Sequence, residues 1–574
     1  MSAPDLAEEP YLARALDGVQ LIEASAGTGK TYTLATLFTR LIVEQRLRMG
    51  QVLAVTYTEA ATQELRKRIR ERLALAADVI GMPVRDDEDH EIALTRFILD
   101  RHLAGGTETP AQLARRLRTA VEETDLAAIF TIHGFCARVL REHALEAGQG
   151  LAAVELLGNA RDLYAEVAAD LWRVHAADPE TADALIGLWK DPDTLAEDLP
   201  ALCKPLPLYP LAPVEGNEER QVAVDATRAG CAAHLVEAIC LYLAEARAVI
   251  ATAFDAKVFD GRRARRPSFD KAFDELQAGA VLADWPRTDK THLQKLLPNA
   301  LLGYCKEGQE ARVPVSPLFD ALRDWCEADD AWQQMQLARR AALLHRLRDE
   351  ARQRLQLLKR TRRVQTYDDL IDRVADALAG GPDTLALVSR LRAQYRIALV
   401  DEFQDTDERQ WQIFARVFGD SDAVRAIGDV PALFLIGDPK QAIYGFRGGD
   451  VATYLSAKHH PATVHADPLT HNFRSRPAVL RAVQALYAGA AAAGQEAFAH
   501  PGIHFEAVEP GGAQRDDHYL RDGTPAPALT LRLLRGDGGP LDADASREAA
   551  VAACVADIYA VLSAARGDRA LIRG

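Results

Sequence analysis

Apolar positions in the first 80 residues alternate between short runs and longer stretches at helical spacing. Residues 19–24 and 52–57 are short apolar runs, and each has the length of a buried strand. Residues 31–44 follow the first run, and a long amphipathic stretch follows the second, both with apolar side chains three or four positions apart. The order strand, loop, helix, strand, helix predicts the opening of a parallel α/β sheet.

The pattern changes in the middle of the chain and then returns. Residues 151–363 are rich in Ala, Leu, Arg and Glu at helical period and contain few β-branched runs, which predicts a mostly helical insertion. Apolar runs resume at residues 396–403 and 433–438 and end in acidic residues, as parallel strands do at a sheet edge. We therefore expect the segments on both sides of the insertion to share one sheet. A helix from about Arg476 and a strand at residues 528–534 are expected further on.

Length and composition limit the class of protein. A chain of 574 residues is too long for one hydrophobic core, so several domains are expected. The formal net charge of −15 argues against general nucleic-acid binding, although a local basic channel is compatible with it. No apolar run approaches the length of a membrane span, and the acidic N-terminus is not that of a signal peptide. Seven single cysteines without a CxxC pair fit reduced thiols in a cytoplasm: Cys136, Cys203, Cys231, Cys240, Cys305, Cys326 and Cys554.

The stretch "ASAGTGKT" predicts a phosphate-binding loop, with an alanine in place of the usual first glycine. Small residues let backbone N–H groups converge on phosphate oxygens at a helix N-terminus. Lys30 would bind the β- and γ-phosphates, and the Thr31 hydroxyl would be a ligand of Mg²⁺. A plain turn is the alternative. The residues of the predicted loop are Ala24, Ser25, Ala26, Gly27, Thr28, Gly29, Lys30 and Thr31.

The stretch "LVDEFQD" places adjacent carboxylates directly after an apolar strand. A P-loop ATPase needs this arrangement, with Asp401 to hold Mg²⁺ and Glu402 to polarise the attacking water. A solvated acidic strand end is the alternative. The phosphate-binding loop elsewhere in the chain favours the catalytic interpretation.

A third stretch, "LIGDPKQAIYGFRGGD", combines a polar sensor with aromatic residues. Gln441 is an uncharged side chain suited to sensing a γ-phosphate. Tyr444, Phe446 and Arg447 lie between glycines and suit stacking on unpaired bases. Interior packing of the two aromatics is the alternative, and the flanking glycines favour a loop.

Seven motifs in chain order together resemble those of superfamily-one DNA helicases of the UvrD/Rep type. They are "EASAGTGKT", "AVTYTEAATQELRKRI", "FTIHGFCARVLRE", "TYDDLI", "LVDEFQDTDERQWQIF", "GDPKQAIYGFRGGD" and "HNFRSRP". The stretch "IEASAGTGKT" and the very long helical insertion are most similar to the RecB type within that family. The resemblance extends over essentially the whole chain.

The resemblance implies an α/β fold in which ATP lies between two RecA-like domains. Arg474 matches the arginine that reaches the γ-phosphate from the second domain and stabilises charge there. Phe473 matches the aromatic that stacks on adenine, although without the motif a core phenylalanine would be favoured. The matching ATP-site positions of the first domain are Lys30, Thr31, Asp401, Glu402 and Gln441.

The same resemblance implies contacts with single-stranded DNA. The positions that match are Thr56, Tyr57, Thr58, Thr131 and His133 for the backbone, and Tyr444 and Phe446 for the bases. A lone histidine is more often structural, which is the alternative for His133. Two basic clusters in the insertion are candidates for phosphate contacts or are solvated faces: Arg262, Arg263, Arg265 and Arg266, and Lys359, Arg360, Arg362 and Arg363.

The implied domain organisation has four segments. Residues 1–150 and 365–455 are expected to form the first RecA-like domain, residues 151–364 the helical inserted domain, and residues 456–574 a partial second RecA-like domain. Asp17 or a shifted Gln20 stands where many such helicases have an adenine-reading glutamine. The chain ends before the remaining helicase motifs and any nuclease domain, so we expect a fragment of a longer protein or a truncated relative.

The resemblance therefore implies an ATP- and Mg²⁺-dependent 3′–5′ DNA helicase of the RecB/UvrD type, acting in recombinational repair of double-strand breaks. Single-stranded and duplex-end DNA and RecC- and RecD-like subunits are the implied partners, in the cytoplasm and without a membrane. Weak turnover is expected for this chain alone. The alternatives are a module that binds ATP and DNA without motor activity, and a P-loop ATPase that acts on something other than nucleic acid.

Overall fold

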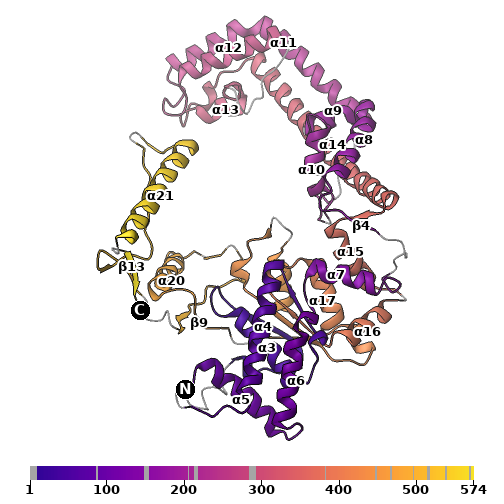
Figure 1. Ribbon diagram of the computed structural model, residues 1–574. Coiled ribbons are helices and arrows are strands. Elements are labelled where there is room, and N and C mark those ends of the chain that lie inside the picture. The colour runs from indigo at the N-terminus through magenta and orange to yellow at the C-terminus, as the bar shows by residue number, and fades with distance from the viewer. Residues whose placement is uncertain are drawn as a thin grey trace. The chain divides into compact units, whose positions relative to one another are not determined.

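The protein divides into two compact units (Figure 1). One unit comprises residues 1–156 and 365–574, and the other comprises residues 157–364. The computed structural model describes residues 10–85, 88–147, 154–204, 206–211, 218–282, 292–381, 383–445, 449–465, 468–495, 497–498, 500–512, 518–536, 539–567 and 570–573.

A six-stranded sheet organises the first unit, with the strand order β3-β2-β6-β7-β1-β8 and parallel pairing between neighbours. The strands are β1 (Gly18–Glu23), β2 (Val52–Thr56), β3 (Ile129–Thr131), β6 (Ile397–Val400), β7 (Ala432–Gly437) and β8 (Thr463–His465). Strands that precede the helical insertion and strands that follow it are neighbours in this one sheet, which confirms the α/β fold. Strand β8 pairs with β1 although it lies beyond residue 455, so the sheet continues further along the chain than expected.

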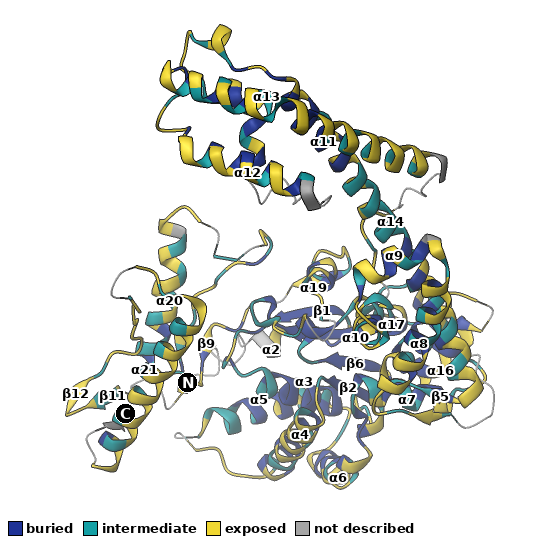
Figure 2. Cartoon of the chain, turned by 90° about the horizontal axis from the view of Figure 1, so that it is seen from above, coloured by how far each residue is buried: buried dark blue, intermediate teal, exposed yellow. Residues whose placement is uncertain are grey.

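Helices cover both faces of the sheet, and the strand side chains alternate between two hydrophobic cores. In β6, Ile397 and Leu399 lie in one core while Ala398 and Val400 lie in the other. Side chains of a strand point alternately to opposite faces, so a strand buried on both faces is apolar throughout. Figure 2 shows the strands buried between helices whose outer faces are exposed.

The helices on the two faces come from different parts of the chain. Those of the first core are α3 (Lys30–Glu44), α4 (Glu59–Val79), α5 (His90–Ala104) and α6 (Pro110–Glu122). Those of the second core are α7 (Ile132–Glu142), α15 (Tyr367–Leu378), α16 (Thr384–Gln394), α17 (Glu408–Phe418), α18 (Asp422–Ala426) and α19 (Val451–Lys458). The short helix α2 (Pro10–Ala13) precedes the first strand.

The C-terminal part of this unit contains two small sheets and two helices. Strand β9 (His471–Asn472) pairs with β10 (Glu509–Pro510), and β11 (His518–Arg521) pairs with β12 (Thr524–Pro525) and β13 (Ala570–Arg573). The helices are α20 (Pro477–Ala492) and α21 (Ala543–Arg566). The strand expected at residues 528–534 is absent from the described chain there, because the alternating leucines have no neighbouring strand to pair with and stay exposed.

Helix α21 corrects the expectation that no apolar run approaches the length of a membrane span. It has 24 residues and is long and apolar enough to cross a bilayer, judged by length and composition alone. One such helix among the described residues is weak evidence for a membrane span.

The second unit is helical, in agreement with the expected insertion. Its helices are α8 (Arg161–Ala177), α9 (Pro179–Leu188), α10 (Pro192–Leu202), α11 (Glu218–Asp255), α12 (Arg266–Leu282), α13 (Pro298–Tyr304) and α14 (Pro317–Arg362). Helix α14 contributes to both hydrophobic cores of this unit, through Trp325 in one and Leu347 in the other. The short strands β4 (Glu155–Leu156) and β5 (Val364–Gln365) lie where the chain passes between the units.

Candidate nucleotide and DNA site

The predicted phosphate loop connects β1 to α3 and has the backbone conformation that close approach of a phosphate requires. Gly27 and Gly29 have φ angles of 80° and 90°, which favour glycine. A Cβ atom on Gly27 would lie 2.7 Å from Cβ of Arg474, so a larger residue does not fit. Gly29 immediately precedes the first residue of α3, Lys30, so the loop ends at a helix N-terminus. The residues present therefore form a cradle that suits phosphate groups.

Three predicted ATP-site residues meet at the edge of the sheet. Nζ of Lys30 lies 2.6 Å from Oε2 of Glu402 and 3.5 Å from Oε1 of Gln441. Lys30 follows β1, Glu402 follows β6 and Gln441 follows β7. The strand order places β7 between β1 and β6, so the carboxyl ends of three adjacent parallel strands deliver these side chains to one place.

Asp401 is half-buried beside Glu402, and this position perturbs its pKa. Burial, and then the neighbouring Glu402 carboxylate, raise the pKa of Asp401 to about 7, against the opposing charge of Lys30. Its Oδ1 accepts a hydrogen bond from the backbone N–H of Glu402 at 2.9 Å. Glu402 has a φ of 50°, a left-handed conformation that is uncommon for a residue with a side chain. Such strain at the strand end indicates a functional position.

The oxygen atoms of Asp401 and Thr31 suit Mg²⁺ that is bound together with a nucleotide. The Asp401 carboxylate and the Thr31 hydroxyl are hard oxygen ligands of the kind that Mg²⁺ prefers. Within the described ranges, no group of three or more His, Cys, Asp or Glu side chains could hold a metal ion. Mg²⁺ would therefore need phosphate oxygens to complete its coordination, as is usual in ATPases.

The sequence motifs did not reveal the role of Gln404 as a bridge in this site. Its Nε2 donates to Oε2 of Glu402 at 2.8 Å, and its Oε1 accepts from the backbone N–H of Asp438 at 3.0 Å. Asp438 in turn accepts a hydrogen bond from Nε2 of Gln441 at 2.8 Å. The only sequence signal for Gln404 was its place inside "DEFQD".

The loop that carries Phe473 and Arg474 is docked on the phosphate loop. The backbone N–H of Phe473 donates to the carbonyl of Gly27 at 2.7 Å. Nδ2 of Asn472, a residue that sequence reasoning missed, donates to the carbonyl of Ala26 at 2.6 Å, and its Oδ1 accepts from the Arg474 N–H at 2.9 Å. The side chain of Phe473 is 53% exposed, so it is not a core residue. Both predicted residues therefore lie beside the phosphate loop.

Gln20 does not reach this site. It lies within β1, is buried, and donates from Nε2 to the carbonyl of Asp17 at 3.1 Å. Its amide nitrogen is therefore used within the turn that precedes β1.

Two of the predicted DNA-contact residues form an aromatic pair. The rings of Tyr57, after β2, and Tyr444, after β7, are stacked with centroids 5.1 Å apart and an interplanar angle of 18°. Two flat rings, from the loops after β2 and β7, offer a surface on which unpaired bases can stack. Phe446 and Arg447, the other members of the predicted stacking loop, lie outside the described residues.

The predicted threonine contacts have structural hydrogen bonds of their own. Thr58 caps α4 by accepting from the N–H of Ala61, and Thr131 caps α7 by accepting from the N–H of Gly134. Thr56 is buried, and its hydroxyl lies 2.7 Å from that of Thr62. Of the three, only Thr58 and Thr131 lie at helix N-termini, where backbone N–H groups favour phosphate.

His133 is packed against an aromatic ring. It meets Tyr367 edge to face, with centroids 5.5 Å apart and an interplanar angle of 89°. Burial lowers the pKa of His133, against the opposing charges of Asp368 and Asp407. The imidazole therefore packs against Tyr367, and its predicted DNA contact stays a prediction.

The two basic clusters lie in the helical unit. The cluster at residues 262–266 is exposed apart from the buried Ala264, and Arg266 pairs with Asp255 at 3.3 Å. In the cluster at residues 359–363, Arg362 pairs with Glu166 at 2.5 Å. Their predicted phosphate contacts stay predictions.

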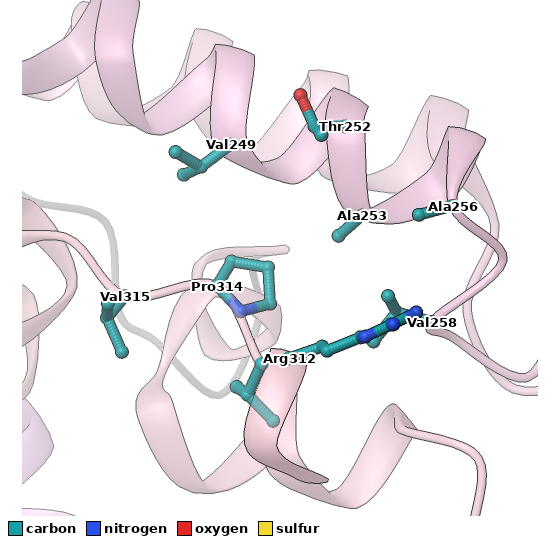
Figure 3. Close-up of a pocket in the computed structure, with 9 residues that line it drawn as sticks. Val249, Thr252, Ala253, Ala256, Val258, Arg312, Pro314 and Val315 are labelled. Carbon is teal, nitrogen blue, oxygen red and sulfur yellow. The ribbon is translucent and has the colours of Figure 1, made fainter. Parts of the chain in front are cut away.

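The helical unit also contains a cavity of about 440 Å³ between α11 and the segment at residues 312–315 (Figure 3). Its lining is mainly apolar and includes Val249, Ala253, Val258 and Pro314, together with Arg312, whose guanidinium lies beside Val258. The lining offers no carboxylate, thiol or imidazole, and its polar side chains are those of Thr252 and Arg312.

The fold and the site define a P-loop domain of the helicase class. The family model of the UvrD/REP helicase N-terminal domain matches residues 7–462, and the chain belongs to this family. It is similar to the RecBCD enzyme subunit RecB of Escherichia coli strain K12, with 31% identity over 571 residues, covering 97% of this chain and 45% of that protein. The corresponding subunit of Haemophilus influenzae is 30% identical over 569 residues, covering 91% and 44%. The subunit of Mycolicibacterium smegmatis is 30% identical over 482 residues, covering 84% and 30%.

The resemblance inferred from the motifs is therefore confirmed. The chain spans less than half the length of each of these three relatives.

Proposed function

We propose that this chain is the ATP-driven part of a RecB-type DNA helicase. The observation that carries the proposal is the meeting of Lys30, Glu402 and Gln441 at one sheet edge, beside the loop of Arg474. Family membership supports the same conclusion. A lysine, a base, a polar sensor and an arginine around one phosphate loop are the parts of an ATP-hydrolysing site.

Each residue has a distinct task in this mechanism. Backbone N–H groups of the phosphate loop bind phosphate oxygens, and Lys30 exchanges Glu402 for the β- and γ-phosphates. Glu402 is then free to take a proton from the attacking water. Gln441 contacts the γ-phosphate, and Arg474 stabilises negative charge as it develops there. Asp401 and Thr31 would hold Mg²⁺ together with the phosphates, and the ion would supply neutralisation of the phosphate charge.

We propose that single-stranded DNA is the second substrate. The Tyr57–Tyr444 pair supplies a stacking surface, and Thr58 and Thr131 lie at helix N-termini that suit backbone phosphates. Movement along the strand is proposed to run 3′ to 5′, and the task is proposed to be unwinding of DNA ends in recombinational repair. RecC- and RecD-like subunits are the proposed protein partners, and the cytoplasm is the proposed location.

Steady-state ATP hydrolysis with and without oligo(dT) tests the proposal. We expect stimulation by DNA in the wild type and loss of hydrolysis in Lys30→Ala. Lys67→Ala is a matched control, since this lysine is exposed on α4 and its side chain is 74% accessible. Nucleotide binding without turnover would instead identify a module that binds ATP and DNA without motor activity. Hydrolysis that DNA does not stimulate would favour an ATPase with another substrate.

Polarity requires a separate experiment. Partial duplexes with either a 3′ or a 5′ single-stranded tail distinguish the two directions of movement. A 3′–5′ motor loads on the 3′-tailed substrate and unwinds it. Preference for the 5′-tailed substrate would overturn the proposed polarity and leave the ATPase proposal in place.

A further inference from the structure

A three-way contact joins the residue before the phosphate loop to a helix from a distant part of the chain. Glu23, the last residue of β1, accepts hydrogen bonds from Nζ of Lys458 at 2.9 Å on each of its two carboxylate oxygens. Its Oε1 also accepts from the hydroxyl of Tyr454 at 3.1 Å. Both partners belong to α19. More than 430 residues of sequence therefore separate the two sides of this contact.

The contact is more than a surface ion pair. The side chains of Glu23 and Lys458 are only 20% and 24% exposed, and the ring of Tyr454 is fully buried. A buried phenol hydroxyl needs a hydrogen-bond partner, and Glu23 supplies it. Removing one member of such a partly buried set leaves the others unsatisfied, which costs more than loss of an exposed pair.

Glu23 is fixed on its backbone side as well. Its carbonyl accepts from the N–H of Leu469 at 3.2 Å, and the N–H of the next residue, Ala24, donates to the carbonyl of Gly437 at 3.0 Å. Ala24 begins the phosphate loop. The direction in which the chain enters that loop is therefore set by β7 on one side and by α19 on the other.

Helix α19 is connected to the tyrosine pair through described contacts. The carbonyl of Tyr444 accepts from the N–H of Gly449 at 3.3 Å. The next residue, Asp450, caps α19 by accepting from the N–H of Ala452, and its own N–H donates to the carbonyl of Thr406. A shift of Tyr444 would therefore act on the N-terminus of the helix whose other end holds Glu23.

We propose that Glu23, Lys458 and Tyr454 are positioning residues that couple the tyrosine pair to the phosphate loop. Single-stranded DNA on Tyr57 and Tyr444 changes the placement of α19, and Glu23 transfers that change to the loop that binds ATP. This inference rests on the proposed function, because it assumes that both ligands bind. It assigns the coupling to a contact outside the residues that touch either ligand.

The test measures coupling directly, by the factor through which oligo(dT) changes ATP turnover and the affinity for a fluorescent ATP analogue. Coupling between two ligands is reciprocal in binding, so the affinity readout does not depend on turnover. We expect Glu23→Gln and Lys458→Met to reduce the DNA effect at least about fivefold, within the usual range of coupling factors. The readout is the ratio of the affinities for the analogue with and without DNA, because a general loss of structure would lower both affinities.

Two further variants make the test specific. The double variant Glu23→Lys with Lys458→Glu restores an ion pair of opposite orientation and should recover part of the coupling. Glu146→Gln is the matched control, since Glu146 has a similar exposure of 18% and pairs with Arg390 at 2.5 Å within the same unit. This control should leave the DNA effect unchanged.

The outcomes separate the two proposals. Wild-type coupling that persists in Glu23→Gln and Lys458→Met overturns the positioning role and leaves the proposed function in place. If the double variant recovers the DNA effect in neither ATP binding nor turnover, the role of the ion pair is also contradicted. Absence of any DNA effect on wild-type ATP binding and hydrolysis overturns both proposals together.

Discussion

The ammonium nitrogen of Lys30 lies 2.6 Å from Oε2 of Glu402, so the proposed phosphate-binding cation and the proposed base are an ion pair. The two charges neutralise each other at the edge of the sheet. A phosphate group competes with Glu402 for Lys30, and its binding frees the carboxylate to act on water. One contact therefore links nucleotide binding to activation of the base.

Replacement of the base should separate binding from hydrolysis. Glu402→Gln is expected to lower the rate of ATP hydrolysis by about 10²–10⁴-fold, the usual contribution of a general base. Affinity for ATP should be kept or increased, because the competing carboxylate on Lys30 is removed. Single-turnover hydrolysis and equilibrium binding measure the two effects. Glu408→Gln, exposed on α17, is the control, and equal turnover in both variants would contradict the role of Glu402.

Removal of the arginine beside the phosphate loop should affect turnover more than binding. Arg474→Ala is expected to reduce the hydrolysis rate by about 10³-fold, as loss of an arginine that stabilises phosphoryl transfer does. The dissociation constant of ATP should change much less. Arg481→Ala on α20, an exposed position, serves as the comparison. A loss confined to ATP affinity would show that Arg474 contributes ground-state binding only.

The stacked tyrosines should contribute to DNA affinity rather than to ATP affinity. Tyr57→Ala and Tyr444→Ala are each expected to weaken oligo(dT) binding by about 1–3 kcal/mol, the usual effect of losing one base-stacking residue. The double variant should lose less than the sum, because the two rings stack on each other. Fluorescence anisotropy with labelled oligo(dT) measures this, with the 73%-exposed Tyr559 changed to Ala as control. Unchanged affinity in both single variants would remove the pair from the DNA site.

The stability of the first unit should depend on pH through Asp405. Burial, followed by the Glu402 carboxylate, raises the pKa of Asp405 to about 6, and its Oδ1 has no hydrogen-bond partner. A carboxyl whose pKa is higher in the folded protein than in the unfolded chain opposes folding once it ionises. The stability that the protonated Asp405 carboxyl contributes is therefore lost progressively as the pH rises from about 4 to 6.

Asp405→Asn removes that titration. Its free energy of unfolding relative to the wild type should rise by about 1–3 kcal/mol from pH 4 to pH 7 and stay level above, since one pKa unit corresponds to about 1.4 kcal/mol. Urea unfolding across this pH range measures the difference. Asp422→Asn, at a fully exposed side chain, should show no such trend. A pH-independent difference for Asp405→Asn would contradict the raised pKa.

Local sequence predicted those parts of the site that depend on a strand and the residues directly after it. The phosphate loop, Asp401 with Glu402, and Gln441 each follow an apolar run, and each lies at the end of a strand in the structure. The prediction of a strand at residues 528–534 was wrong for a related reason. Alternation shows that a segment can be a strand, but only a neighbour with free N–H and C=O groups makes it one.

Contacts between distant segments were not predictable in this way. Nothing in the local sequence distinguishes Gln404 from any other polar residue within a motif. Its bridge to Asp438 arises only because β6 and β7 are adjacent. Asn472 reaches Ala26 across more than 440 positions, and Lys458 reaches Glu23 across more than 430. No periodicity within either segment carries that information.

The sequence by itself determined strands β1, β2, β6 and β7 and the small, basic and acidic residues that follow them, because backbone sterics and apolar periodicity act over a few residues. The tertiary structure alone decided the strand order β3-β2-β6-β7-β1-β8, and with it the meeting of Lys30, Glu402 and Gln441. That order depends on burying two faces of a sheet against helices from both ends of the chain, which is a property of the whole core rather than of any segment.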